Sequence, residues 1–415
     1  MKKVCLSLAL LLILALSISA VVAQDEVVTL TMGSWRTEDI EQWDAIIAAF
    51  NEEFPNIQVN FEPTLNTEYD SSLLVALQGG GGPDLVTCRP FDISLALYEQ
   101  GYLTDVSDTP GLENFGDVAR SGWIADDGTI YCVPMASVLH GFIYSVDMFN
   151  ENGWEVPATV DEFTALLETI DAAGITPLAM GTRDGWTNWT MGFHSNAPNW
   201  YMGEAGRQAL LAGDAAITDA MFVEPMEFVL SWAPYLPDGF EAISYADTQQ
   251  LFPLGLAAIF PAGSWEIPIF EANADFELGA FKPPVPEAGQ ECFVTDHVDI
   301  GLGMNANTEH PEAVMTFLEW VAGPEFAERY TNLQPGFFSL SDYEIDITNP
   351  LAQEMASWRQ ECSTTIRLEA QYLSRGEISP RLEAWRLFPA AFAGEVTVEE
   401  MAAELQTYLW YPDGE

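Results

Sequence analysis

Aromatic and charged residues occur together where predicted strands end. Trp35 and Arg36 follow the first predicted strand, and Phe91 and Asp92 follow the third. A flat aromatic ring offers a large contact surface at a small cost in conformational freedom. A charged side chain beside it forms strong hydrogen bonds with hydroxyl groups. These residue types suit recognition of a small polyhydroxylated molecule, such as a sugar, that has an apolar ring face and a fringe of hydroxyls.

Most of the 13 tryptophans are better explained as core residues. Four recur at helical spacing and are assigned to the core: Trp43, Trp232, Trp320 and Trp358. Trp35, Trp186 and Trp265 differ, because each lies in a predicted loop beside a glycine or a charged residue. We therefore expect these three rings to face a ligand.

Strands and helices alternate along the chain. A strand at 27–32, an amphipathic helix that ends before Pro55 and a strand at 57–61 predict two parallel strands with a right-handed crossover. Further strands are expected at 85–88, 130–135, 141–144, 257–260 and 300–304, and further helices at 69–78, 93–98, 308–322 and 397–409. Thr159 with Glu162, and Thr397 with Glu400, form capping boxes at two helix starts. The alternation predicts an α/β fold.

The first 23 residues have the features of a secretory signal peptide. Lys2 and Lys3 precede an apolar run at 4–18, and small residues lead to Ala23. We expect cleavage near Ala23 and release outside the cytoplasm, in the periplasm or the extracellular space. The alternative is an uncleaved membrane anchor. No cysteine follows the small residues, so the pattern of a lipid-anchored cysteine is missing.

Composition narrows the classes of partner. The formal charge of −49 would repel nucleic acid and anionic lipid surfaces. Hydrophobic residues make up 48% of the chain, which predicts a packed protein, and 415 residues exceed one typical core. The sequence therefore predicts a protein of two lobes that does not bind nucleic acid. We expect it to be a monomer.

The cysteines and histidines predict no metal or cofactor. Cys88, Cys132, Cys292 and Cys362 remain after the leader and allow three disulfide pairings. Our preferred pairing joins Cys88 to Cys132 and Cys292 to Cys362, and four buried thiols are the alternative. The spacing contains no CxxC motif, and the four histidines lack metal-ligand spacing.

Seven motifs in order resemble those of the extracellular solute-binding proteins of family 1, the carbohydrate-binding components of ABC importers. They are FPNIQV at 54–59, GPDLV at 82–86, GTIYCVP at 128–134, YSVDMF at 144–149, PATVDEF at 157–163, AAIFPAGSW at 257–265 and HPEA at 310–313. Each motif alone is weak, but their common order covers nearly the whole chain after the leader. The resemblance implies a protein that captures a mono- or oligosaccharide and delivers it to a membrane permease.

The resemblance also implies a fold of two lobes, of the type II periplasmic-binding-protein kind. Each lobe would hold a mainly parallel sheet flanked by helices. The N-terminal lobe would take 24–135 and about 294–333, and the C-terminal lobe about 136–293 and 334–415. The connecting segments would lie near 134–138, 293–296 and 333–336, with the ligand between the lobes.

The candidate ligand-binding residues combine strand ends with positions near these connections. They are Trp35, Arg36, Phe91, Asp92, His140, Asp184, Trp186, Trp189, Ser264, Trp265, Glu266, Asp296, His297 and Phe337. By its position in the family motif, Trp265 is the strongest candidate for stacking on a sugar ring. His140 and His297 are better explained as structural histidines, although each lies close to a predicted connection and could line the cleft.

Two other functions stay open at this stage. A secreted glycoside hydrolase would need two carboxylates about 5 to 10 Å apart, and Glu266 with Asp296 could be proposed for them. The same fold could instead bind a polyamine, a glycerol phosphate or a peptide. No catalytic motif supports an enzyme, so we expect a binding protein.

Overall fold

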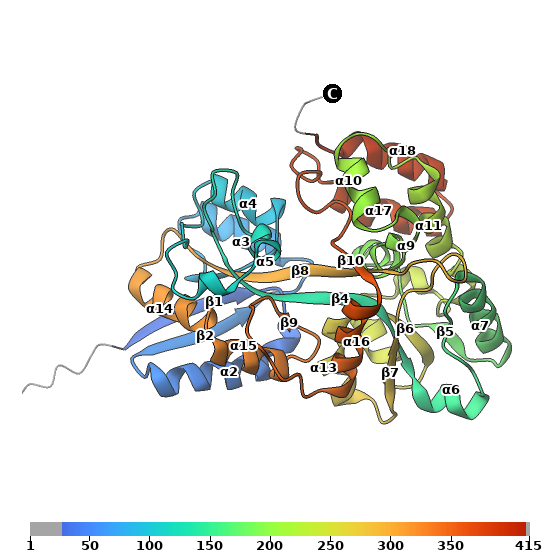
Figure 1. Ribbon diagram of the computed structural model, residues 1–415, viewed down its shortest axis with the longest axis horizontal. Coiled ribbons are helices and arrows are strands. Elements are labelled where there is room, and N and C mark those ends of the chain that lie inside the picture. The colour runs from blue at the N-terminus through green and yellow to red at the C-terminus, as the bar shows by residue number, and fades with distance from the viewer. Residues whose placement is uncertain (1–26, 412–415) are drawn as a thin grey trace, which may run out of the picture.

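The structure, a computed structural model, describes residues 27–411. Two α/β halves are joined by the long strands β4 (Val133–Ser145) and β8 (Phe293–Met304), which run from one half into the other (Figure 1). This arrangement confirms the predicted two-lobed α/β class. The predicted leader at 1–23 lies outside the described residues. Among residues 27–411, no helix is long and apolar enough to cross a membrane.

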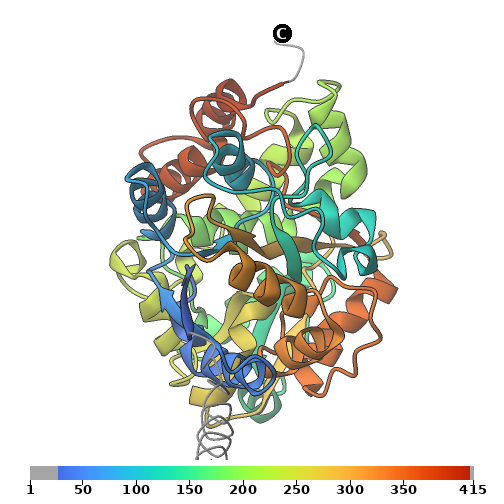
Figure 2. The same cartoon turned by 90° about the vertical axis from the view of Figure 1, so that its left-hand side faces the viewer.

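The first half is built on three parallel strands. The strand β1 (Val28–Ser34) lies between β2 (Ile57–Pro63) and β3 (Leu85–Cys88). Helices flank this sheet on both sides, and Figure 2 views the molecule from this end. These helices are α2 (Ile40–Glu53), α3 (Tyr69–Gln78), α4 (Asp92–Glu99), α5 (Asp117–Ser121), α14 (Pro311–Val321) and α15 (Pro324–Leu333). In α2, Trp43, Ile46 and Phe50 recur at helical spacing and bury one face against the sheet.

The second half is richer in helices. Its sheet contains β5 (Thr176–Leu178), β6 (Ala257–Gly263) and β7 (Leu278–Phe281) beside β4. Its helices are α6 (Val146–Asn152), α7 (Val160–Ala172), α8 (His194–Asn196), α9 (Pro198–Tyr201), α10 (Glu204–Leu211), α11 (Ala220–Leu230), α12 (Tyr245–Leu251), α13 (Ile267–Asn273), α16 (Pro350–Glu361), α17 (Pro380–Phe392) and α18 (Val398–Tyr408). Both predicted capping boxes are present, at the start of α7 and of α18.

The strand pairing is mixed, so the mainly parallel sheet expected for each lobe is present in the first half but not in the second. The strand β8 is antiparallel to β3 and to β4, and β4 is antiparallel to β6 and β7. The chain leaves the first half along β4 and returns along β8, so neighbouring connections must run in opposite directions. The strands predicted at 130–135 and 141–144 are parts of one continuous β4, whose central residues are all buried.

The residues that follow α15 stay in contact with the first half. The strand β9 (Phe338–Ser339) pairs with β4 at Ser137 and Ala136. Beyond it, Tyr343 still contacts the first half, because its hydroxyl accepts a hydrogen bond from Asn114 at 2.8 Å and donates one to the carbonyl of Ala322 at 3.3 Å.

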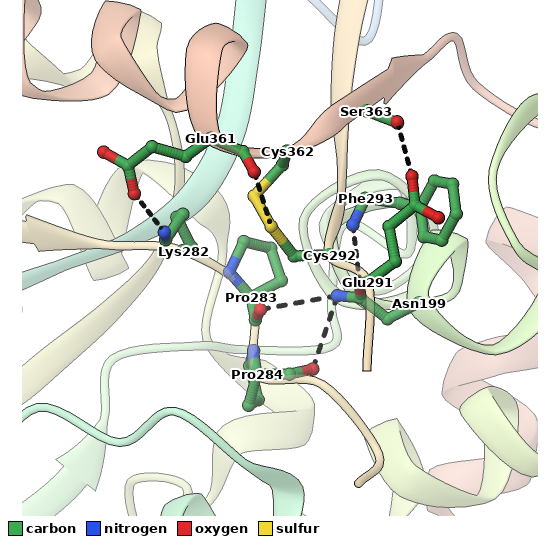
Figure 3. Close-up of a disulfide and its surroundings, with 10 residues drawn as sticks. All are labelled: Asn199, Lys282, Pro283, Pro284, Glu291, Cys292, Phe293, Glu361, Cys362 and Ser363. Atoms are coloured by element: carbon green, nitrogen blue, oxygen red, sulfur yellow. Dashed lines mark hydrogen bonds and ion pairs between the residues drawn. A yellow bond between two sulfur atoms is a disulfide. The ribbon is translucent and has the colours of Figure 1, made fainter. Parts of the chain in front are cut away.

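The two disulfides join the cysteines as we predicted. Cys88 at the end of β3 is bonded to Cys132, directly before β4. Cys292, directly before β8, is bonded to Cys362 at the end of α16 (Figure 3). There the strand β10 (Ser363–Thr365) begins and pairs with the start of β8. Each bond fixes one end of a connecting strand within its own half.

Candidate functional site

Aromatic rings from both halves line one cleft. A cavity of about 660 Å³ is bordered by six of them: Trp35, Trp186, Tyr245, Trp265, Phe337 and Trp385. An adjoining cavity of about 460 Å³ is bordered by Phe91, Asp92 and His297. The two cavities share the side chains of Arg89, Asp299, Arg367, Glu369 and Arg381, so they form one continuous cleft.

The rings reach the cleft because their strands end at its edge. Trp35 directly follows β1, and Trp265 lies in the short 3-10 helix η6 (Ser264–Glu266) that follows β6. Trp186 precedes a π-helix, η3 (Asn188–Phe193), and packs edge-on against Tyr245 at 4.6 Å between ring centroids. A Cβ atom on Gly185 would overlap the carbonyl oxygen of Trp385, so this glycine allows the two tryptophan segments to meet.

Trp265 is held in one orientation by buried partners. Its indole N–H donates to Glu266 Oε1 at 3.0 Å and lies 3.3 Å from the Tyr245 hydroxyl. The ring folds back over Gly263, where a Cβ atom would overlap it. His140 packs against it edge-on at 5.3 Å. A ring fixed in this way can stack on a ligand with little further loss of conformational entropy.

Glu266 lies beneath this ring and does not line the cleft. Its carboxyl is fully buried and accepts hydrogen bonds from the Tyr245 hydroxyl at 2.5 Å and from Gln249 Nε2 at 2.9 Å. Burial raises the pKa of Glu266 to about 7, against the opposing effect of these hydrogen bonds and of Arg36. We infer that Glu266 positions Trp265 and Tyr245 rather than a ligand.

All three guanidinium nitrogens of Arg36 bind neighbouring carboxylates. Its Nε and Nη2 bind both oxygens of Asp39 at 2.9 and 2.8 Å, and its Nη1 binds Glu38 at 2.9 Å. The guanidinium lies over the ring of Phe337 at 4.9 Å. Arg36 therefore fixes this wall of the cleft.

Eight of the fourteen predicted residues border the cleft, and six do not. The eight are Trp35, Arg36, Phe91, Asp92, Trp186, Trp265, His297 and Phe337. The six that lie behind or outside its walls are His140, Asp184, Trp189, Ser264, Glu266 and Asp296. Ligand contact by any of the fourteen stays a prediction, and the structure brings eight of them together at the cleft.

Each of the six residues has a structural role instead. His140 Nδ1 lies 3.1 Å from the carbonyl of Thr190, and Trp189 stacks on Phe193 at 4.5 Å. Asp184 accepts a hydrogen bond from the backbone N–H of Tyr245 at 2.8 Å. Asp296 binds Arg359 at 2.7 Å. Consequently Glu266 and Asp296, the pair considered for hydrolysis, do not face a common space.

The Ser264 hydroxyl joins the end of β6 to β4 and to the loop at Gly336, and its replacement gives a test. Its hydroxyl accepts from the N–H of Leu139 in β4 at 3.0 Å and donates to the carbonyl of Gly336. We expect Ser264→Ala to lower the free energy of unfolding by about 1 to 3 kcal/mol, because it leaves buried polar groups without partners. Denaturant titration measures this loss. Ligand affinity should change little, and a loss of affinity without a loss of stability would contradict the structural role.

The sequence analysis missed ten residues that border the larger cavity. They are Glu38, Asn66, Arg89, Thr190, Tyr245, Asp299, Arg367, Glu369, Arg381 and Trp385. Two of these, Arg367 and Glu369, lie at 366–379, which has no helix or strand and thus gives no periodic signal, and Arg381 lies in the first turn of α17. A usable signal was the local density of arginines, because Arg359, Arg367, Arg375, Arg381 and Arg386 lie close together in a chain with only 14 basic residues.

Two α/β halves joined by three connections, with an aromatic cleft between them, define a two-lobed solute-binding protein of type II. The chain belongs to the family of bacterial extracellular solute-binding proteins, whose sequence profile matches residues 33–328. Members of this family act outside the cytoplasm and bind solutes rather than convert them.

Individual relatives agree with this assignment. The chain is 24% identical over 318 residues to the multiple sugar-binding protein of Streptococcus mutans, a match that covers 74% of each chain. A solved structure from work on xylan utilization by Caldanaerobius polysaccharolyticus has a TM-score of 0.80 at 18% identity and covers 92% of this chain and 99% of that one. RafE in complex with raffinose has a TM-score of 0.77 at 24% identity and covers 92% and 98%.

Proposed function

We propose that the protein is the substrate-binding component of an ABC importer that captures a mono- or oligosaccharide in the cleft and delivers it unchanged to a membrane permease. The orientation of Trp265 carries the proposal, because a buried carboxyl and a buried glycine hold its ring at the wall of a cavity bordered by five further rings. The names of the relatives support a sugar as the solute, since they include a multiple sugar-binding protein and a raffinose complex.

The energetics of the cleft suit a transport protein. A micromolar dissociation constant corresponds to about −8 kcal/mol. Stacked rings and a few charged hydrogen bonds can supply this free energy without trapping the ligand. Because both halves contribute rings, a bound saccharide would stabilise the closed arrangement, and a permease could distinguish loaded from empty protein.

The organisation expected from the sequence forms part of the proposal. One lobe takes 24–135 with the segment from about 294, and the other takes about 136–293 with the C-terminal part. We move the third boundary from 333–334 to the stretch between Tyr343 and Pro350, because of the contacts of Tyr343 with the first half. The protein would be an exported monomer, without catalytic activity or affinity for nucleic acid, whose leader is cleaved near Ala23.

A thermal-shift screen tests the proposed function. The purified chain without its leader is heated with neutral and acidic saccharides, polyamines and phosphorylated polyols. A ligand at 100 times its dissociation constant stabilises the folded form by about 2.7 kcal/mol and raises the melting temperature. We expect a saccharide to produce the largest shift and to be recovered intact by chromatography. A shift with polyamines alone, or new reducing ends in the recovered saccharide, would contradict the proposal.

A further inference from the structure

The cleft is rich in arginine, although the chain as a whole is strongly acidic. The chain has 63 acidic and 14 basic residues, and its lysines are Lys2, Lys3 and Lys282. Four of the remaining basic residues, all arginines, border the larger cavity: Arg36, Arg89, Arg367 and Arg381. The surface of such a chain repels anions at long range, so this local concentration of positive charge needs a separate explanation.

Two of the four arginines, Arg367 and Arg381, are incompletely paired. Arg89 Nε and Arg381 Nη2 share a single carboxylate, Asp70, at 2.7 and 3.2 Å, and Arg89 Nη2 also donates to Asn66 Oδ1 at 2.8 Å. Arg367 makes a longer ion pair with Asp299, at 3.3 Å. Within residues 27–411, the buried Nε atoms of Arg367 and Arg381 have no hydrogen-bond partner. Buried donors without partners are costly, and a ligand oxygen would relieve that cost.

The surrounding charges agree with this picture. Glu369 borders the cleft as well, but its carboxylate lies 2.7 Å from His194 Nε2 and is directed to that ring. Burial lowers the pKa of Arg367 and of Arg381, and the positive charge of Arg89 adds to the lowering, while nearby carboxylates oppose it. Arg89 therefore lies close enough to Arg367 and to Arg381 for its positive charge to act on each of them.

Each of these arginines lies over a tryptophan of the cleft. The guanidinium carbon is 4.3 Å from the ring centre for Arg89 over Trp35, 4.8 Å for Arg381 over Trp385 and 5.9 Å for Arg367 over Trp265. Stacking on a ring fixes the plane of a guanidinium, so its N–H donors are already oriented before a ligand binds. A sugar ring seated against the aromatic walls would bring its substituents to these donors.

We propose that the saccharide is acidic and that a uronic-acid carboxylate binds between Arg89, Arg367 and Arg381. This inference rests on the proposed function. A planar carboxylate matches the guanidinium fork, and charge-assisted hydrogen bonds of this kind are about twice as strong as neutral ones. Arg89 belongs to the first half, whereas Arg367 and Arg381 follow β10 in the second half. The carboxylate would thus add a second bridge between the halves, beside the one that Asp70 makes to Arg381, and favour closure.

Titration calorimetry with matched saccharides tests the inference. The probes are di- and trisaccharides of glucuronate, galacturonate and mannuronate, their methyl esters, the corresponding neutral hexose oligosaccharides and a sulfated hexose disaccharide. We expect at least one uronate to bind about 10- to 100-fold more tightly than its own methyl ester. Binding of neutral saccharides alone, or a preference for the sulfated sugar, overturns the inference and keeps the proposed function. Binding of no saccharide at all overturns both.

Substitutions assign the effect to the named arginines. Arg367→Gln and Arg381→Gln should each weaken uronate binding about tenfold or more and change methyl-ester binding little. Arg329→Gln is the matched control, because that arginine is exposed on α15 and pairs with Glu325. Arg367→Lys keeps the positive charge but lacks the planar pair of N–H donors, so it should bind the uronate with intermediate affinity. Arg89→Gln tests whether the arginine of the first half contributes to the same binding. Melting curves of each variant without ligand show whether it is folded. Equal losses of affinity for the uronate and for its methyl ester would overturn the assignment of the carboxylate to these arginines.

Discussion

Trp265→Ala is expected to weaken saccharide binding by about thirtyfold or more. An aromatic side chain at the centre of a binding site typically contributes at least about 2 kcal/mol, and each 1.4 kcal/mol corresponds to about a factor of ten in affinity. The ring also separates Glu266 and His140 from the cleft, so its removal admits water to buried polar groups. Titration calorimetry with the best saccharide from the screen measures the loss.

The stability of the variant must be measured beside its affinity. Trp265 is only 7% exposed, so alanine should also lower the melting temperature of the unliganded protein. Trp154→Ala is a suitable control, because this tryptophan lies in the same half, is partly buried against Phe149 and is remote from the cleft lining. The control should lower stability and leave affinity unchanged. An unchanged affinity of Trp265→Ala for the saccharide would show that this ring does not contact the ligand.

Glu266 is expected to make the stability of the protein depend on pH between about 4.5 and 7. The pKa of its buried carboxyl is about 7 in the folded protein, above the usual value of 4.5. Below pH 4.5 the carboxyl is protonated in both the folded and the unfolded state, and its contribution is fully present. As pH rises towards 7, the unfolded state releases the proton first, so the contribution is lost. The loss approaches about 3 kcal/mol and levels off above pH 7.

Glu266→Gln should remove this part of the pH dependence. Glutamine cannot ionise, yet its carbonyl oxygen can still accept from Tyr245 or Trp265. Denaturant unfolding of both proteins from pH 4.5 to pH 8 gives the difference in free energy, which isolates Glu266 from other titrating groups such as Asp39 and Asp92. Glu344→Gln, an exposed position, should keep the slope of the unmodified protein. A constant difference between the unmodified protein and Glu266→Gln across this range would contradict the raised pKa.

The sequence determined the local structure and much of the wall of the cleft. Capping at Thr159 and Thr397 and the periodicity of α2 depend on residues within a few turns of one another, so the sequence displays them directly. Trp35 and Trp265 were found because a strand end is a local feature, and in an α/β fold such ends gather at one edge. The disulfide pairs followed the order of the cysteines along the chain.

Only the tertiary structure decided which polar residues face the cleft. Ser264 and Glu266 adjoin Trp265 in sequence but point behind it, because η6 turns directly after β6. Arg367 lies in an irregular segment and Arg381 at the start of α17, and long-range ion pairs with Asp299 and Asp70 hold the two side chains in place. The continuity of β4 and the antiparallel pairing with β8 likewise depend on a partner more than 150 residues away in the chain. Local propensity carries no information about such contacts, since their free energy exists only once the two halves have met.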